Sequence, residues 1–215
     1  MRNESFFSIQ ACGRPTRSAH SPPYPGNVGV KNHLARNWGG REDTRMMLSA
    51  WVQFSWNLKN LPAESPKLAP RYSVEAASLE DRPLLLAAVS RSVSMETGWS
   101  DDLTARVKLA TEIINTDFPA GEVSFVAIKH GARIIGAAAI RDSGDKVSNL
   151  PLGVSVLNEY RCRGLGTFLL YESLRRLRDK GLDEARVMTK KGIPADRYLY
   201  PKFGGQRIVL VGAPV

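Results

Sequence analysis

A short run of arginines and glycines in the C-terminal half of the chain has the spacing of an anion-binding loop. Arg161-Cys162-Arg163-Gly164-Leu165-Gly166 follows an apolar segment that ends at Val156 and precedes a long amphipathic segment. Glycines let the backbone curl tightly and approach a ligand without side-chain obstruction. A helix that begins here has unpaired amide N–H groups and a positive dipole end, so the loop is suited to a phosphate or pyrophosphate. Thr167 adds a hydroxyl group in the first turn of that helix.

Two common phosphate-binding motifs do not fit this loop. A Walker loop requires G-x-x-x-x-G-K-[ST], and no Lys-Ser or Lys-Thr pair follows these glycines. The dinucleotide fingerprint G-x-G-x-x-G requires glycine or alanine at its third position, where this chain has Leu169. The pattern therefore indicates a phosphate loop of another type.

The loop and the strand before it resemble the acyl-coenzyme A signature of the Gcn5-related N-acetyltransferases (GNAT). The matching residues are an apolar strand from Gly153 to Val156, then Glu159-Tyr160-Arg161, then Arg163-Gly164-Leu165-Gly166. The resemblance implies that the loop amides hold the pyrophosphate of coenzyme A while the two arginines add positive charge. It also implies that the strand parts from its neighbour, so that its exposed backbone can hydrogen-bond the pantetheine arm. The cofactor site implied in this way consists of Val154, Val156, Arg161, Arg163, Gly164, Leu165, Gly166 and Thr167.

A second motif, Tyr198-Leu199-Tyr200-Pro201-Lys202-Phe203-Gly204, is similar to the L-Y-x-K-x-G-F of the same family. There a tyrosine often donates a proton to the departing thiolate, which implies this role for Tyr200; the alternative is a packing aromatic. A free thiol has a pKa of about 8.5 and a tyrosine of about 10, so a phenol can protonate the sulfur at modest cost. The general base stays open. Glu159 is one candidate, and Glu96 or Asp101 could instead neutralise a cationic acceptor.

The composition is that of a globular protein with an excess of positive charge. Of the 215 residues, 43% are hydrophobic and 24% charged, and the net charge is +9. This charge attracts an anion such as coenzyme A, and equally nucleic acid, but no aromatic-rich motif supports nucleic acid as a partner. Two cysteines and three scattered histidines form no disulfide or metal-binding pattern, so we expect no metal and a cytoplasmic location. We also expect no membrane span, since no apolar run reaches the ~18 residues it requires.

The segments around the motifs alternate between strand and helix patterns from residue 71 to residue 215. Strands are read from short apolar or alternating runs, and helices from apolar residues repeated every three or four positions. The expected strands are 72–76, 123–129, 133–141, one that ends at Val156, 185–189 and 206–211. The expected helices are one capped by Ser78 or Asp81 that runs toward Met95, then 103–118, 165–180 and 194–200.

This order resembles the GNAT fold. It implies a mixed α/β (α+β) domain over residues 71–215, with a mostly antiparallel central sheet flanked by helices and with splayed fourth and fifth strands. Pro151 lacks the N–H that a ladder needs, so a bulge or a parted pair is expected there. One strand follows the last helix where the family has two. We therefore expect the N-terminal extension or a partner chain to cover the open edge of the sheet.

Residues 1–70 differ from the rest, because they hold seven of the 13 prolines. We expect residues 1–43 to be disordered. Over 44–70 we expect a short amphipathic helix and a Pro-rich linker, since apolar residues recur every three or four positions. The helix packs on the core, docks a partner or membrane surface, or belongs to an over-extended reading frame; the sequence leaves these open. The first 45 residues faintly resemble an organellar targeting peptide. The residues that define the helix are Met47, Trp51, Phe54, Leu58 and Leu61.

The sequence thus predicts an N-acetyltransferase that moves an acetyl group from acetyl-CoA to a primary amine by direct attack in a ternary complex. The alternative is a non-catalytic coenzyme A-binding or structural module with the same fold. The acceptor, a small-molecule or protein amine, is not identified by the sequence, and a homodimer stays open. The prediction requires that the strand ending at Val156 and the strand at 185–189 are not paired along their whole length.

Overall fold

The computed structural model describes residues 51–99, 102–143 and 148–210. All of them belong to one compact unit, Met46–Val215. The segment expected to be disordered, 1–43, lies outside the described residues, as do Met47 and Asp101. No helix in the described part of the chain is long and apolar enough to cross a membrane.

Within the described residues, seven strands and three longer helices follow one another in the expected order from β2 onward. The strands are β1 (Trp51–Asn57), β2 (Ser73–Ala76), β3 (Ser124–His130), β4 (Arg133–Ile140), β5 (Val154–Val156), β6 (Glu184–Lys190) and β7 (Gln206–Leu210). The longer helices are α1 (Arg82–Ser94), α2 (Leu103–Glu112) and α3 (Leu165–Asp179). The shorter helical turns of the described residues are η1 (Leu58–Asn60), η2 (Leu79–Asp81), η3 (Thr97–Trp99), η4 (Ile113–Asp117), which continues α2, η5 (Asn158–Tyr160), η6 (Ala195–Leu199) and η7 (Lys202–Gly204).

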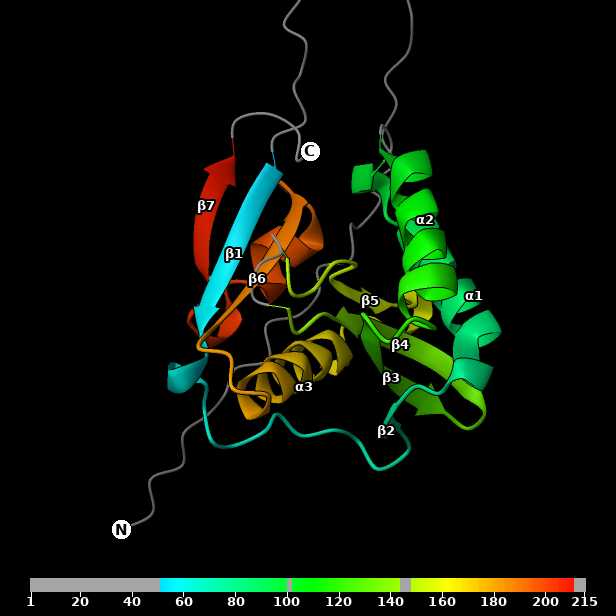
Figure 1. The fold of residues 1–215 in the computed structure, drawn as a ribbon, viewed down its shortest axis with the longest axis horizontal. Coiled ribbons are helices and arrows are strands. Elements are labelled where there is room, and N and C mark those ends of the chain that lie inside the picture. Colours follow the sequence, from blue (N-terminus) through cyan, green and yellow to red (C-terminus); the bar gives the residue numbers. More distant parts are fainter. Residues whose placement is uncertain (1–50, 100–101, 144–147, 211–215) are drawn as a thin grey trace, which may run out of the picture. The chain divides into compact units, whose positions relative to one another are not determined.

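The strands form two sheets rather than one continuous sheet. Figure 1 shows β2, β3, β4 and β5 as one group, in that order, and β6, β1 and β7 as the other. Every neighbouring pair is antiparallel. The described residues of β5 and β6 share no ladder, so the expected splayed fourth and fifth strands are confirmed.

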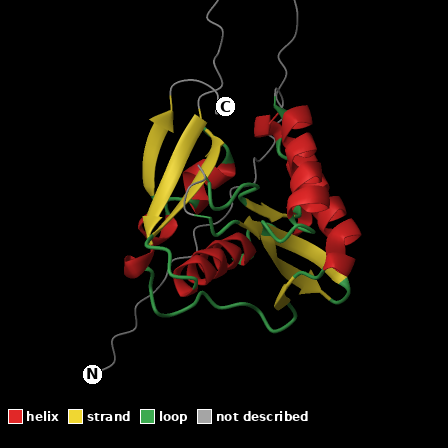
Figure 2. Ribbon diagram, in the orientation of Figure 1, coloured by secondary structure: helices red, strands yellow, loops and turns green. Residues whose placement is uncertain are grey.

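Helices cover both sides of the four-stranded sheet (Figure 2), and α1 and α3 both pack on β4. Seven consecutive residues of β4, Ile134–Ile140, are buried, which is the pattern of a central strand enclosed on both faces. A side chain on Gly136 would lie 3.1 Å from Leu169 of α3, so the glycine permits close contact between helix and strand.

The prediction of an amphipathic helix between residues 44 and 70 is wrong, because Trp51–Asn57 forms strand β1. Its buried residues alternate, with Val52, Phe54 and Trp56 inside, which is the period of a strand. The sequence WVQFSWN is rich in β-branched and aromatic residues and fits both periods. Backbone pairing decides between them, since β1 is hydrogen-bonded to β6 on one side and to β7 on the other.

The N-terminal extension therefore supplies the strand that was missing after the last helix, but β1 lies between β6 and β7 rather than along the outer edge of the sheet. The chain continues on the core after β1, with Leu58 and Leu61 buried. The Tyr171 hydroxyl of α3 then donates a hydrogen bond of 2.9 Å to the carbonyl of Pro62. Residues 51–62 are thus an integral part of the domain.

Candidate functional site

The two sheets touch at Asn149 and then part. The backbone amides of Asn149 and Leu150 both donate to the carbonyl of Arg186 in β6, at 2.9 and 3.3 Å. The buried Asn149 side chain accepts from the Arg186 amide at 2.9 Å and donates to the Arg141 carbonyl at 3.2 Å. One amide side chain therefore ties the end of β4 to β6 at the point of divergence.

A turn follows this contact and directs β5 away from β6. The Gly153 amide donates to the Leu150 carbonyl at 2.9 Å, and Gly153 has a φ of 61°. Pro151 lies inside the turn, where the structure needs no ladder N–H from it. The expected bulge or parted pair at Pro151 is confirmed, and its position marks where the two sheets separate.

Strand β5 directs part of its backbone away from β4. Ser155 lies opposite Ala137, and the Leu157 amide donates to the Ile135 carbonyl at 2.9 Å. Because hydrogen-bonded and non-hydrogen-bonded pairs alternate in an antiparallel ladder, Ser155 bonds to β4 while Val154 and Val156 point their N–H groups the other way. The Val156 carbonyl on that side accepts hydrogen bonds from Ser92 and Arg161, at 3.1 and 3.2 Å.

The loop after β5 has the conformation of a helix-terminal anion site. Cys162 and Gly164 have left-handed φ angles of 59° and 79°. The first hydrogen bond of α3 runs from the Phe168 amide to the Gly164 carbonyl, at 3.0 Å. The amides of Leu165, Gly166 and Thr167 precede that bond, so they are the donors that a helix start leaves for an outside acceptor. Gly164 is exposed, with no described atom within 4 Å of the place a Cβ would take.

The two arginines of the loop are held by the protein itself. The Arg161 guanidinium donates to the Glu96 carboxylate at 2.9 Å and to the Ser92 carbonyl at 3.3 Å. Ser92 lies near the C-terminal end of α1, where the helix dipole favours a cation. Arg163 donates to the Glu159 carbonyl at 3.0 Å and to the Tyr72 hydroxyl at 3.4 Å. The side chain of Arg161 therefore links the loop to the end of α1 and to Glu96, which precedes η3, and its positive charge is paired with the Glu96 carboxylate.

Glu159 lies on η5 in a pair of salt bridges. Its carboxylate is 2.9 Å from Arg133 and 3.4 Å from Arg91. Its own backbone N–H, followed by Arg91 and Arg133, holds the pKa of this carboxyl below its ordinary value. A lowered pKa makes a carboxylate a weaker base. This geometry lends no support to a role as general base.

Tyr200 follows η6 and reaches the parted edge of β5. Its side chain is 2% exposed, and its hydroxyl accepts a hydrogen bond of 3.2 Å from the Val154 amide. The rings of Phe54 and Trp56 from β1 lie 5.6 and 5.9 Å from its ring. Burial raises the pKa of the Tyr200 phenol, and the Val154 N–H and the Arg106 guanidinium offset part of this rise. The Tyr200 ring thus packs in the core while its hydroxyl lies at β5, whereas Tyr198 is 70% exposed.

Sequence reasoning missed Arg106 of α2, whose guanidinium binds the turn before β5. It donates to the carbonyls of Pro151 and Leu152 at 3.2 and 2.6 Å. One signal was present in the sequence. Arg106 lies three residues after Leu103 and four before Ala110, so it belongs to the face of α2 that is turned toward the core.

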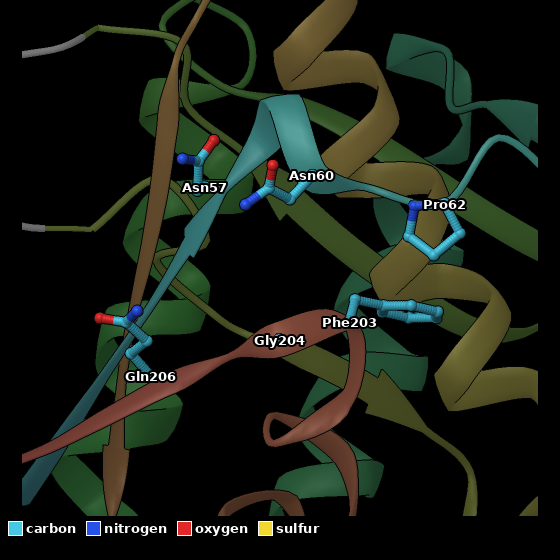
Figure 3. A pocket seen from close by; sticks show the side chains of 6 residues that line it. All are labelled: Asn57, Asn60, Pro62, Phe203, Gly204 and Gln206. Atoms are coloured by element: carbon cyan, nitrogen blue, oxygen red, sulfur yellow. The ribbon is translucent and has the colours of Figure 1, made fainter.

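A hollow of about 310 Å³ lies elsewhere, between the end of β1 and the start of β7. Figure 3 shows the amide side chains of Asn57 and Gln206 on one side of this hollow and the ring of Phe203 near Pro62 on the other. Its lining contains no residue of β5 or of the loop before α3, so it is separate from the candidate site. The residues that line it are Asn57, Asn60, Pro62, Phe203, Gly204 and Gln206.

Comparison with protein-family models identifies the family to which this arrangement corresponds. Residues 93–204 match the model of the Acetyltransferase (GNAT) family. The chain belongs to the GNAT family. The matched span contains β5, the loop before α3 and Tyr200, and it supports an N-acetyltransferase activity in general terms. Strand β1 lies outside the match, so the GNAT model gave no indication of it.

Solved structures agree with the GNAT fold. A GCN5-related N-acetyltransferase from Sphaerobacter thermophilus is 16% identical, with a TM-score of 0.56 over 75% of this chain and 50% of its own. A Drosophila protein is 14% identical, with a TM-score of 0.53 over 75% and 48%. A functionally unknown conserved protein from Staphylococcus epidermidis is 14% identical, with a TM-score of 0.51 over 74% and 58%. The chain spans about half the length of these proteins, and at such identities the likeness concerns the fold. No curated protein matches the sequence.

Proposed function

We propose that this protein transfers an acetyl group from acetyl-CoA to a primary amine. The observation that carries the proposal is the parting of β5 from β6 beside the start of α3, where three amides precede the first hydrogen bond of the helix. An extended chain of amides joined to a pyrophosphate has the chemistry that such an edge and such a loop recognise. Coenzyme A is a ligand of this kind.

The two parts of the cofactor would be held by two parts of this site. The pantetheine arm lies along Val154 and Val156 of β5. The Val154 N–H is bonded to the Tyr200 hydroxyl, so the Val156 N–H, which points away from β4, is the donor that faces the ligand. The pyrophosphate accepts hydrogen bonds from the amides of Leu165, Gly166 and Thr167, and the dipole of α3 adds a favourable field. The side chain of Arg163 adds positive charge at the rim of the loop. Arg161 acts through the position of the loop, because its guanidinium is bound to Glu96.

The reaction proceeds by direct attack. The nitrogen of a neutral amine forms a bond to the thioester carbonyl carbon, and the Val156 N–H stabilises the negative charge that develops on the oxygen. The carbon–sulfur bond then breaks, and the Tyr200 phenol gives its proton to the departing thiolate. The proton released by the new amide nitrogen passes to solvent and the phenolate is reprotonated. Much of the rate comes from the alignment of two bound reactants.

Glu159 and Glu96 are both paired with arginines, so neither carboxylate serves as the general base in this proposal. We therefore propose an acceptor that arrives as the free amine. This same observation favours the second candidate function, a GNAT fold that binds coenzyme A without turnover. The two functions share the cofactor site and differ in thiol release.

Binding and turnover are tested in two arms. Calorimetry measures coenzyme A binding to the wild type, to Gly164→Glu and to Gly181→Glu. Gly181 is a matched control, since it has a left-handed φ of 90°, no described atom within 4 Å and a place at the opposite end of α3. We expect Gly164→Glu to abolish binding and Gly181→Glu to retain it. Equal affinity in all three proteins would refute the loop assignment.

The second arm measures thiol release from acetyl-CoA across a panel of amines that includes amino acids, polyamines and lysine peptides. Release that depends on one class of amine supports the transferase. Tight binding of coenzyme A without release by any amine supports the non-catalytic module.

A further inference from the structure

The Arg106 guanidinium is fixed against the turn that begins β5. Its two donors reach the consecutive carbonyls of Pro151 and Leu152, at 3.2 and 2.6 Å. The Trp99 ring lies 5.0 Å from the guanidinium carbon and is itself 6% exposed. Trp51 of β1 packs on Trp99 with ring centres 5.8 Å apart. Two hydrogen bonds and a stacked ring leave this side chain one orientation.

Tyr200 faces the same turn. Its hydroxyl accepts from the Val154 amide, one residue after Gly153. A side chain placed on Gly153 would collide with the Tyr200 hydroxyl and lie 3.9 Å from Nη2 of Arg106. The phenol oxygen and the guanidinium therefore flank one glycine, at the end of the strand where the thioester is proposed to lie.

The surroundings of the phenol contain one kind of charge. Strand β1 contributes the uncharged rings of Phe54 and Trp56, and β5 contributes the Val154 N–H. Helix α2 contributes Arg106, the charged side chain that acts on this phenol within the described part of the chain. Burial raises the pKa of Tyr200 and lowers the pKa of Arg106, and each group offsets the other's shift. Removing either one therefore changes the ionisation of its neighbour.

We propose that Arg106 is a positioning residue that stabilises the phenolate of Tyr200 and fixes the turn from which β5 parts from β6. The first part rests on the proposed function, in which Tyr200 protonates the thiolate. In that step the phenol O–H bond breaks, the S–H bond forms and a negative charge stays on the buried phenol oxygen. The nearby guanidinium lowers the cost of this charge in a site that burial makes unfavourable for it.

The test measures the phenol directly, without any acceptor. A fluorotyrosine in place of Tyr200 lowers the intrinsic pKa of the phenol into a range where folded protein can be titrated, and ¹⁹F NMR follows its ionisation. The compared backgrounds are wild type, Arg106→Gln, Arg106→Lys and Lys108→Gln. Lys108 is the matched control, because it loses the same charge from the exposed side of the same helix.

We expect the fluorophenol pKa to rise in Arg106→Gln by more than in Lys108→Gln, and to stay near the wild-type value in Arg106→Lys. A shift in Arg106→Gln no larger than in Lys108→Gln overturns the inference. If the glutamine variant does not fold, Arg106→Met, which removes the charge but keeps a long side chain, replaces it in the same titration. The fluorophenol pKa should then rise by more in Arg106→Met than in Lys108→Met, and a rise no larger than in the control overturns the inference.

Failure of the inference and failure of the proposed function give different results. If the fluorophenol pKa responds to Arg106 but calorimetry detects no coenzyme A binding, the electrostatic link stands and the transferase function fails. If coenzyme A binds and amines release thiol but the phenol pKa is insensitive to Arg106, the transferase stands and the role of Arg106 fails.

Discussion

Replacing Phe54 by alanine removes a side chain from the centre of β1. Phe54 is fully buried, stacks on Trp56 and contacts the ring of Tyr200. Truncation of a buried phenylalanine costs about 3–5 kcal/mol of unfolding free energy, the lost burial plus the cavity left behind. For a domain of this size each kcal/mol lowers the midpoint of thermal unfolding by roughly 2–4 °C, so the expected decrease is roughly 6–20 °C.

The assay is urea denaturation followed by circular dichroism, together with a thermal melt. Gln53→Ala is the matched control, since Gln53 is the neighbouring residue and points to the opposite, half-buried side of the same strand. We expect this control to stay within about 0.5–1 kcal/mol of the wild type. If Phe54→Ala is no less stable than Gln53→Ala, β1 is not a central strand, and the account of the three-stranded sheet is wrong.

Three further predictions concern catalysis and acid stability. Tyr200→Phe should lower kcat by about 10²-fold or more while coenzyme A affinity, measured by calorimetry, changes little; a wild-type kcat would remove the acid role. Glu159→Gln should cost less than about tenfold in kcat/KM because arginines hold its carboxylate, whereas loss of a general base costs about 10²–10⁴-fold. Burial raises the pKa of Asp196, but the hydrogen bonds from Arg207 outweigh this effect and bring the pKa below its ordinary value. A group with a lowered folded pKa stabilises the protein above its unfolded pKa of about 3.9, and this stability is lost as the pH falls through the folded pKa. Acid denaturation monitored by circular dichroism should therefore depend less on pH in Asp196→Asn, and identical profiles would contradict the assignment.

Features that depend on a few consecutive residues were predictable from the sequence. The loop before α3 has a left-handed backbone at Gly164, and a glycine in the sequence indicates that such a conformation is accessible there. The amphipathic pattern of the segment 165–180 predicted helix α3, and its leucines at three- and four-residue spacing are buried: Leu165, Leu169, Leu170, Leu174 and Leu177. Pro151 indicated that the hydrogen-bond ladder of the sheet is interrupted near this residue, because a proline has no N–H to donate. The GNAT resemblance supplied the splayed strands, and local chemistry supplied the place where they part.

Features that depend on distant partners were not predictable. Strand β1 pairs with segments more than 100 residues away, and WVQFSWN carries the helix period as well as the strand period. Arg106 finds its carbonyl partners 45 and 46 residues further along the chain. Arg161 was expected to serve the ligand, and the structure binds it to Glu96 and to the end of α1. Arginine side chains reach far enough that the sequence alone does not show which acceptor they meet.

Hydrogen exchange at two adjacent amides of β5 tests the central claim most directly. Ser155 bonds to β4 in the ladder, whereas the Val156 N–H points toward the side from which β6 has parted. Addition of coenzyme A should slow exchange at Val156 strongly and change Ser155 little, because the pantetheine arm pairs with the parted edge. Equal protection of the two amides, or none at Val156 while coenzyme A is bound, would contradict the account.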